Sequence, residues 1–216
     1  MPYQLCLFDL DGTLTDPKQG ITRSVRHALL SFGIQEDNLD ALEKFIGPPL
    51  RDSFQEFYGF TAAEAETAVA KYREYFSDTG IWENTPYPGM LDALQILKKS
   101  GLRLAIATSK PTVFATRIAE RFGFLSYFDH IEGSELDGTH SEKIDIIESI
   151  RCRLDPEHTM QTIMIGDRRF DIDGARQAGV DSIGVTWGYG SIAELEEARA
   201  THIVSTWEEL LRIIER

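Results

Sequence analysis

Two carboxylates, Asp9 and Asp11, follow a short apolar run at residues 5–8 and precede a glycine, Gly12. The run has the length and composition of a buried strand, and open α/β sheets place their ligands at the carboxyl ends of strands. On a continuing strand the two side chains would share a face, where their charges repel unless a cation or a proton lies between them. Gly12 allows a turn that brings backbone N–H groups near a ligand. An oxygen-only site of this kind suits Mg²⁺ with phosphate, although Asp-Gly is also an ordinary turn signal.

Polar side chains also follow two later apolar runs. Thr108 and Ser109 come after residues 102–107, and Asp167 comes after residues 162–165. Because the carboxyl ends of parallel strands lie at one edge of a sheet, these residues are expected to meet the two carboxylates of the first strand in one crevice. The hydroxyls and N–H groups at 108–109 can bind phosphate at a helix N-terminus, and a simple helix cap is the alternative interpretation.

Two further charged positions extend this predicted site. Asp171 follows Asp167 by four residues at an expected helix start, where acids often serve only as caps. Together with the first two carboxylates, this pair suggests a cation site. Lys143 opens a helix predicted at about 142–153 and offers the fixed positive charge that phosphate needs, although most lysines lie on the solvated surface. Lys110 is equally suitable by charge, and the local sequence does not choose between the two lysines.

The elements that must position these residues fall into two blocks. Residues 15–17 are predicted as a turn and the start of a helix, and from there to residue 84 the apolar residues recur at helical spacing with no convincing strand. After residue 86 helices alternate with strands, which predicts an α/β fold with a Rossmann-like parallel sheet and helices on both faces. Strands are expected at 5–8, 102–107, 128–131, 162–165, 182–185 and 203–204. The predicted domains are an α/β core at 1–15 and 85–216 and an inserted all-helical domain at 16–84.

Composition excludes some function classes. The 216 residues carry a net charge of −13, which argues against binding a nucleic-acid polymer. No apolar stretch approaches the length of a membrane span. The N-terminal residues do not show a basic region followed by an apolar region, the pattern of a secretory signal peptide. Cys6 and Cys152 are expected as free thiols in or near the core, in a reduced compartment. A cytoplasmic protein without membrane contact is therefore expected.

Four segments, in order, resemble the four motifs of the haloacid dehalogenase superfamily: residues 9–14 (DLDGTL), Thr108, Lys143 and residues 166–171 (GDRRFD). The resemblance covers essentially the whole chain, and the helical insertion is similar to the helical cap of that superfamily. The chain is most similar to the phosphoglycolate phosphatase-like branch. Within that branch, residues 182–190 (SIGVTWGYG) resemble the 5′-nucleotidase-like members.

The resemblance implies specific roles for the acidic residues. Asp9 would be the nucleophile that forms an aspartyl-phosphate, and Asp11 would be the general acid for the leaving alcohol and then the base for water. Mg²⁺ would be held by the side chain of Asp9, the backbone carbonyl of Asp11 and the carboxylate of Asp167. Asp171 would support these ligands.

The same resemblance implies which residues bind substrate. Thr108 and Lys143 would hold the phosphoryl oxygens, so Lys143 is preferred over Lys110. Gly12 and Ser109 are expected beside them, through backbone N–H and hydroxyl groups.

The insertion would act as a lid that excludes water and contacts the leaving group. Residues 47–51 (GPPLR) resemble the substrate-facing loop of the cap, so Arg51 is expected to contact a carboxylate or a second anionic group. A surface arginine without such a role is the alternative. Residues 187–190 (WGYG) have two interpretations: they flank the site, or Trp187 has an aromatic packing role, which is the favoured one. Arg168 and Arg169 are expected on a helix surface.

The predicted function is Mg²⁺-dependent hydrolysis of a small phosphorylated metabolite, with phosphoglycolate and nucleoside 5′-monophosphates as leading substrates. One alternative is a phosphomutase on the same scaffold, which would return the phosphoryl group to a sugar rather than to water. Another is a non-catalytic phosphometabolite-binding regulator, which the intact Asp9 and Asp11 disfavour. A metal-independent dehalogenase is disfavoured because it has no need of an acid at position 11. The sequence carries no indication of the oligomeric state.

Overall fold

The computed structural model describes residues 3–215, and its chain divides into two compact units. The first, called here the α/β unit, comprises Met1–Thr15 and Pro86–Arg216. The second, the helical unit, comprises Asp16–Thr85. Among the described residues, no helix is long and apolar enough to cross a membrane.

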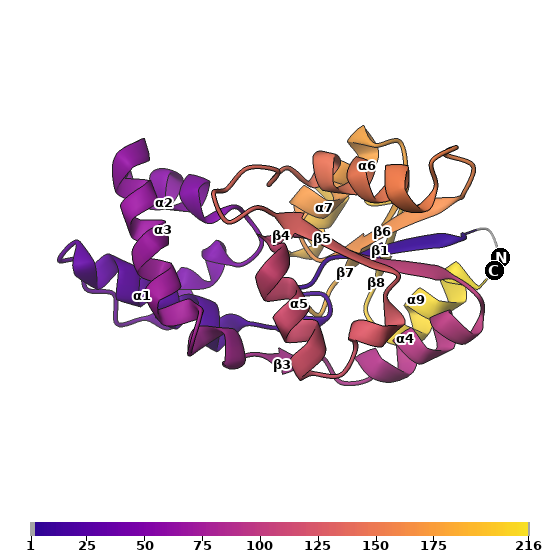
Figure 1. The fold of residues 1–216 in the computed structure, drawn as a ribbon, viewed down its shortest axis with the longest axis horizontal. Coiled ribbons are helices and arrows are strands. Elements are labelled where there is room, and N and C mark those ends of the chain that lie inside the picture. The colour runs from indigo at the N-terminus through magenta and orange to yellow at the C-terminus, as the bar shows by residue number, and fades with distance from the viewer. Residues whose placement is uncertain (1–2, 216) are drawn as a thin grey trace. The chain divides into compact units, whose positions relative to one another are not determined.

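A six-stranded parallel sheet forms the centre of the α/β unit, with the strand order β5-β4-β1-β6-β7-β8 (Figure 1). The strands are β1 (Leu5–Phe8), β4 (Arg103–Pro111), β5 (His130–Ser134), β6 (Thr162–Gly166), β7 (Asp181–Val185) and β8 (His202–Val204). β1 lies between β4 and β6, with Leu5 opposite Arg103 and Thr162. All four residues of β1 are buried, as expected for a strand that is covered on both faces.

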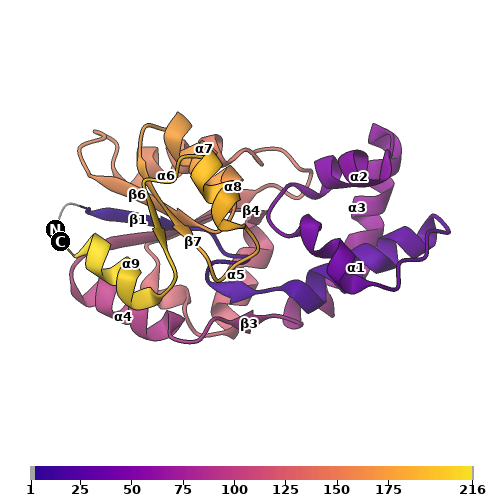
Figure 2. The same ribbon diagram turned by 180° about the vertical axis from the view of Figure 1, so that it is seen from behind.

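Helices cover both faces of this sheet. They are α4 (Met90–Lys99), α5 (Thr112–Arg121), α6 (Lys143–Leu154), α7 (Arg169–Gln177), α8 (Ile192–Glu197) and α9 (Trp207–Ile214), with a 3-10 turn at Leu125–Tyr127. Seen from both sides, α6 and α7 lie on one face and α4, α5 and α9 on the other (Figures 1 and 2). The predicted α/β fold, with its parallel sheet and two helical layers, is confirmed.

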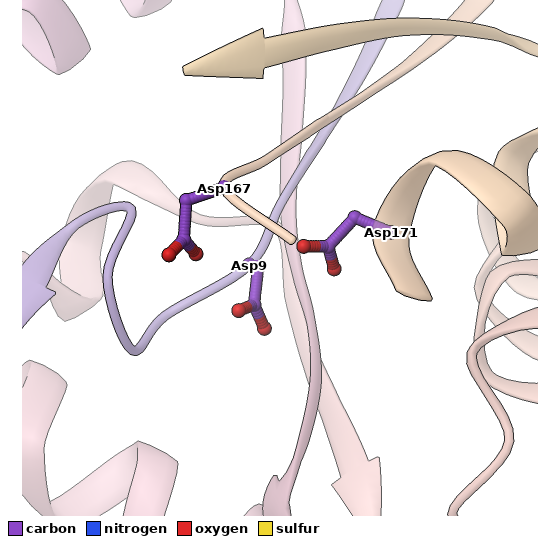
Figure 3. A group of neighbouring side chains, drawn as sticks. All are labelled: Asp9, Asp167 and Asp171. Atoms are coloured by element: carbon purple, nitrogen blue, oxygen red, sulfur yellow. The ribbon is translucent and has the colours of Figure 1, made fainter. Parts of the chain in front are cut away.

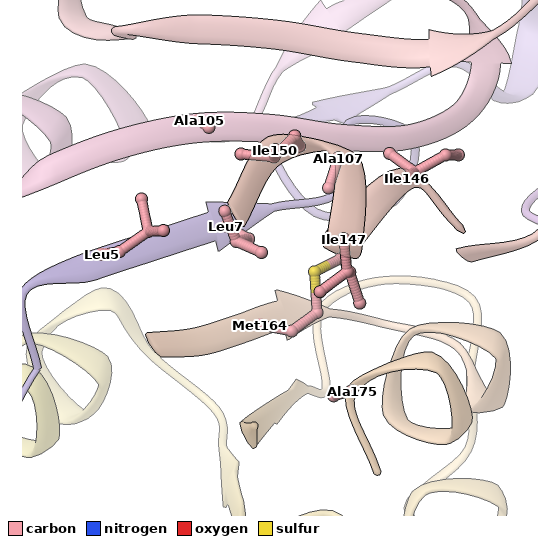
Figure 4. Packing of buried hydrophobic residues seen from close by; sticks show 9 residues of the cluster. All are labelled: Leu5, Leu7, Ala105, Ala107, Ile146, Ile147, Ile150, Met164 and Ala175. Carbon is pink, nitrogen blue, oxygen red and sulfur yellow. The ribbon is translucent and has the colours of Figure 1, made fainter. Parts of the chain in front are cut away.

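Packing of α6 on the sheet places the start of this helix. Leucines of β1, alanines of β4 and isoleucines of α6 form one buried cluster, together with Met164 and Ala175 (Figure 4). The small alanines Ala105 and Ala107 leave room for the bulky side chains Ile146, Ile147 and Ile150 of the helix. Each fully buried isoleucine contributes about 1.5–3 kcal/mol relative to exposure. This packing holds the first residue of α6, Lys143, near the carboxyl ends of the central strands.

The helical unit contains α1 (Lys18–Ser31), a 3-10 helix (Leu39–Phe45), α2 (Leu50–Tyr58), α3 (Ala62–Phe76) and a short 3-10 turn (Gly80–Trp82). α3 opens with the predicted capping box, in which Thr61 and Glu64 each accept a hydrogen bond from the backbone of the other. Several rings contact one another around the buried Phe45 and Phe54, and we call them the aromatic cluster: Phe32, Phe45, Phe54, Phe57, Tyr58 and Phe60.

Three local predictions differ from the structure. The turn predicted at 15–17 is wrong, because Thr15–Asp16 (β2) pairs as a short strand with Thr85–Pro86 (β3). Two residues are too few to show a periodicity, and the pairing partner is far along the chain. The weak strand expected at 128–131 lies instead at His130–Ser134. Cys6 is buried in β1 as expected, whereas Cys152 is exposed on α6.

Candidate active site

The loop after β1 carries the first two carboxylates. Asp9 lies just beyond the strand, and its N–H donates to the carbonyl of Ile165 in β6 at 2.8 Å. Gly12 has a φ of +85°, a conformation that glycine adopts without strain. Its N–H donates to the carbonyl of Thr15 and closes the loop. Asp9 and Asp11 are 4% and 7% exposed. The two residues thus belong to a tight buried loop rather than to a continuing strand.

Three carboxylates meet at the ends of β1 and β6. Oxygens of Asp9, Asp167 and Asp171 lie within 4.8 Å of one another, and all three residues are buried (Figure 3). Burial, followed by the charges of Asp171 and Asp9, raises the pKa of Asp167 well above its ordinary value. Burial also raises the pKa of Asp171 to about 6, although Lys143 acts in the opposite direction. We call this group the carboxylate cluster; its oxygen-only donors and shared negative charge suit a divalent cation.

Lys143 bridges two members of the carboxylate cluster. Its Nζ lies 2.9 Å from Oδ1 of Asp9 and 2.7 Å from Oδ1 of Asp171, and it donates to the carbonyl of Ala107 at 2.9 Å. Burial alone would lower the pKa of this lysine, but Asp171 and Asp9 outweigh burial and raise it. Lys143 is therefore a buried, charged residue of the site and not a solvated surface lysine.

Asp167 is held by groups that come from both ends of the sequence. The hydroxyl of Thr13 donates to its Oδ1 at 3.2 Å, and the N–H of Tyr189 donates to its Oδ2 at 2.8 Å. A Cβ on Gly12 would lie 2.3 Å from Oδ2, and a Cβ on Gly188 would lie 2.4 Å from the same atom. Any side chain at either glycine would thus displace the carboxylate. The sequence analysis does not predict the contact between Tyr189 and Asp167. The glycines on either side of Tyr189 are the feature of the sequence that could have indicated such a close approach.

Trp187, for which packing is the favoured interpretation, and Arg168, which is expected on a helix surface, both contact site residues. Trp187 packs on Trp207, with the ring centres 4.7 Å apart, and its Nε1 also donates to the carbonyl of Thr13 at 3.1 Å. The expected packing role is present, but Trp187 also supports the loop after β1. The expectation of a surface position is wrong for Arg168, whose Nε lies 2.9 Å from Glu194 and whose side chain is only 15% exposed.

Arg169 is exposed as expected. The N–H of Arg168 also donates to Oδ2 of Asp171 at 3.1 Å, which orients that carboxylate.

The end of β4 brings hydroxyls and a second lysine to the site. Thr108 is buried, and its Oγ1 accepts the N–H of Lys110 at 3.3 Å. The hydroxyl of Ser109 donates to the carbonyl of Ser141 at 3.4 Å. The Nζ of Lys110 lies 2.6 Å from Oδ2 of Asp11. Burial raises the pKa of Asp11, although Lys110 acts to lower it. Both candidate lysines are thus in the site, each beside a different carboxylate.

Arg51 belongs to the helical unit. It lies in the first turn of α2 and forms an ion pair with Glu66 of α3. The expected contact of Arg51 with a substrate stays a prediction. All other predicted site residues lie in the α/β unit.

The model of the haloacid dehalogenase-like hydrolase family matches residues 6–185 of this chain. A 5′-nucleotidase of Pseudomonas aeruginosa is 47% identical over 99% of this chain and 96% of that protein. The tyrosine-protein kinase PtkA of Mycobacterium tuberculosis is 36% identical over 96% of this chain and 71% of that protein. Phosphoglycolate phosphatase 1 of Pseudomonas aeruginosa is more distant, at 29% identity over 96% of this chain and 78% of that protein.

A solved structure is also similar to this chain. The crystal structure of a predicted phosphatase from Clostridium acetobutylicum has a TM-score of 0.95 and 46% identity, and the match covers 100% of this chain and 99% of that one. The family model spans all of the site residues in the α/β unit except the segment around Trp187 and Tyr189. This chain therefore belongs to the haloacid dehalogenase-like hydrolases and is a phosphatase of that family.

Proposed function

We propose that this phosphatase hydrolyses a small phosphomonoester through an aspartyl-phosphate on Asp9, with Mg²⁺ as its cofactor. The observation that carries the proposal is the buried bridge of Lys143 between Asp9 and Asp171, within the carboxylate cluster. A carboxylate nucleophile needs nearby positive charge to accept a phosphoryl group, and phosphoryl transfer depends mainly on positioning and charge neutralisation.

In the proposed reaction, a carboxylate oxygen of Asp9 attacks phosphorus as the bond to the leaving oxygen breaks. Asp11 gives its proton to that oxygen, so that a neutral alcohol leaves. A water molecule then attacks the aspartyl-phosphate and gives a proton to Asp11, which releases inorganic phosphate and restores both carboxyl groups. Thr108 and Lys143 are proposed to bind the phosphoryl oxygens throughout, with Gly12 and Ser109 beside them.

The residues of the site fit a hard divalent cation. Asp9 and Asp167 would bind it through their side chains and Asp11 through its backbone carbonyl, with Asp171 as support. In support, the carboxylate cluster offers only oxygen donors, and burial, with the charges of neighbouring carboxylates, raises the pKa values of Asp167 and Asp171. When bound, Mg²⁺ would withdraw charge from the phosphoryl oxygens.

We further propose that residues 1–15 and 85–216 form the catalytic domain, and that residues 16–84 form a cap that contacts the leaving group. Arg51 would bind a carboxylate or a second anionic group of the substrate there. Similarity to a 5′-nucleotidase at 47% identity favours nucleoside 5′-monophosphates as substrates. Phosphoglycolate comes second, because the relative with that name is more distant.

A phosphate-release assay over a panel of metabolites tests the proposal. The panel contains nucleoside 5′-monophosphates, phosphoglycolate and hexose phosphates, each assayed with Mg²⁺ and with EDTA. We expect Mg²⁺-dependent release of inorganic phosphate, strongest with a member of the first two classes. Isomerised sugar phosphate without free phosphate would indicate a phosphomutase instead, and binding without turnover would indicate a regulator.

A further inference from the structure

Lys110 is a buried cation whose role none of the family motifs assigns. We propose that Lys110 is a positioning residue, which holds Asp11 by one carboxylate oxygen so that the other faces the oxygen of the leaving group. The inference rests on the proposed role of Asp11 as general acid and base. It concerns how this carboxyl is aimed.

The two oxygens of Asp11 have different surroundings. Oδ2 lies 2.6 Å from Nζ of Lys110, and the two side chains are 10% and 6% exposed. Oδ1 is buried and has no hydrogen-bond partner among the described residues. A buried polar atom without a partner is costly, and such atoms are uncommon in folded proteins. One oxygen is therefore anchored by a cation, while the other is left for a group that binds from outside the chain.

The sheet gives Lys110 this position through an irregularity in β4. Thr108 pairs with Gly133 of β5, and after this pair the register shifts before Ser134 finds its partner. A Cβ on Gly133 would lie 2.1 Å from the carbonyl oxygen of Lys110, so only glycine permits this path of the chain. The hydroxyl of Ser134 donates to the carbonyl of Ser109 at 2.9 Å and secures the irregular segment. Bulges of this kind often redirect a side chain beside an active site.

The two buried lysines divide the carboxylates between them. Lys143 contacts Asp9, the proposed nucleophile, and Asp171, which is proposed to support the cation site. Lys110 contacts Asp11, the proposed general acid and base. This division predicts that loss of each lysine impairs a different part of the reaction. The part that depends on Asp11 can be tested with two substrates that differ strongly in how much they need a proton on the leaving oxygen.

The experiment measures kcat/KM of Lys110→Met on a nucleoside 5′-monophosphate and on p-nitrophenyl phosphate. The alkoxide of the nucleotide leaves poorly and needs the proton, whereas p-nitrophenolate is stable as an anion. General acid catalysis contributes ~10²–10⁴-fold, so we expect a loss of about 100-fold on the nucleotide and below about 10-fold on the aryl ester. Lys110→Arg, which keeps the charge, should recover most of the nucleotide activity. Lys99→Met, an exposed lysine of α4, is the matched control and should leave both rates unchanged.

A double-mutant cycle tests whether Lys110 acts through Asp11. Asp11→Asn should show the same preference for the aryl ester, and adding Lys110→Met to it should cause little further loss, because the two residues act as one unit. Equal losses on both substrates, or losses that add fully in the double variant, would overturn the inference. Failure of the proposed function looks different, because the wild type would then release no phosphate from either ester, or Asp9→Asn would keep its turnover.

Discussion

The two units of this phosphatase both have apolar cores, but they differ in the charged side chains that they bury. In the part of the chain that the structure describes, every buried charged residue lies in the α/β unit, and Asp9, Lys143 and Asp167 are among them. In the helical unit ion pairs lie nearer to the solvent: Lys18, for example, lies 2.8 Å from Asp40, and their side chains are 38% and 74% exposed. The core of the helical unit is apolar, and two rings of the aromatic cluster, Phe45 and Phe54, are buried in it.

This difference indicates which unit carries the chemistry. A buried charge is costly unless it is paired, so a group of buried carboxylates persists only where a partner or a ligand compensates for it. Aromatic rings stabilise by packing and carry no such cost; in the helical unit Phe54 lies 5.0 Å from Phe45 and 5.8 Å from Phe60, measured between ring centres. Substitutions in the two units should therefore affect different quantities.

The largest effect is expected from Asp9→Asn in the α/β unit. An amide is a poor nucleophile, so we expect kcat for phosphate release to fall by roughly 10⁴-fold or more with an unchanged circular dichroism spectrum. Asp40→Asn, at an exposed carboxylate of the helical unit, is the matched control and should keep the wild-type kcat. Substantial turnover by purified Asp9→Asn protein would refute the nucleophile assignment.

The next effect concerns the core of the helical unit. Phe54 is fully buried in the aromatic cluster, so Phe54→Ala should lower the free energy of unfolding of this unit by about 3–5 kcal/mol. Chemical denaturation measures this change, and Phe54→Leu, which keeps much of the volume, should cost less. An unchanged denaturation midpoint for Phe54→Ala would mean that the cluster is not a core.

A smaller effect links pH to the carboxylate cluster. Because burial raises the pKa of Asp171 from 3.8 to about 6, and that of Asp167 well above its ordinary value, the folded metal-free protein binds more protons than the unfolded chain in this window. Its stability should therefore fall as the pH rises from about 4 through 6. Loss of these protons leaves carboxylates that can bind Mg²⁺.

Thermal melts with and without Mg²⁺ at pH 5 and pH 7.5 test this linkage. Protons compete with the cation for the carboxylates, so the stabilisation by Mg²⁺ should be larger at the higher pH. At a concentration 100 times the dissociation constant it should reach about 2.7 kcal/mol. Equal stabilisation at both pH values would contradict a cation site at Asp167 and Asp171.

The smallest effect is expected from Lys18→Met on the surface of the helical unit. Exposed ion pairs are screened by water and salt, so loss of the contacts with Asp40 and Glu43 should leave the melting temperature and the kcat indistinguishable from those of the wild type. Lys143→Met, which removes the buried lysine, should in contrast lower kcat strongly, although less than Asp9→Asn. Similar effects of the two substitutions would remove the distinction between the units.

Local chemistry made much of the fold predictable from the sequence. The strand at Leu5–Phe8, the helix at Trp207–Ile214 and the capping box at the start of α3 agree with the predictions, because apolar periodicity and capping residues act over a few positions. Strand ends of a parallel sheet share one edge, so the meeting of Asp9 with Asp167 also followed from the sequence pattern.

Only the tertiary structure decided which groups touch. Local sequence left Lys110 and Lys143 as alternatives, and the structure places both in the site, beside different carboxylates. The bond from Lys143 to Asp9 joins residues 134 positions apart, and the bond from Thr13 to Asp167 joins residues 154 positions apart. Such contacts depend on the strand order, the register and the irregularity in β4. These features are set by packing across the whole sheet, which no local pattern in the chain records.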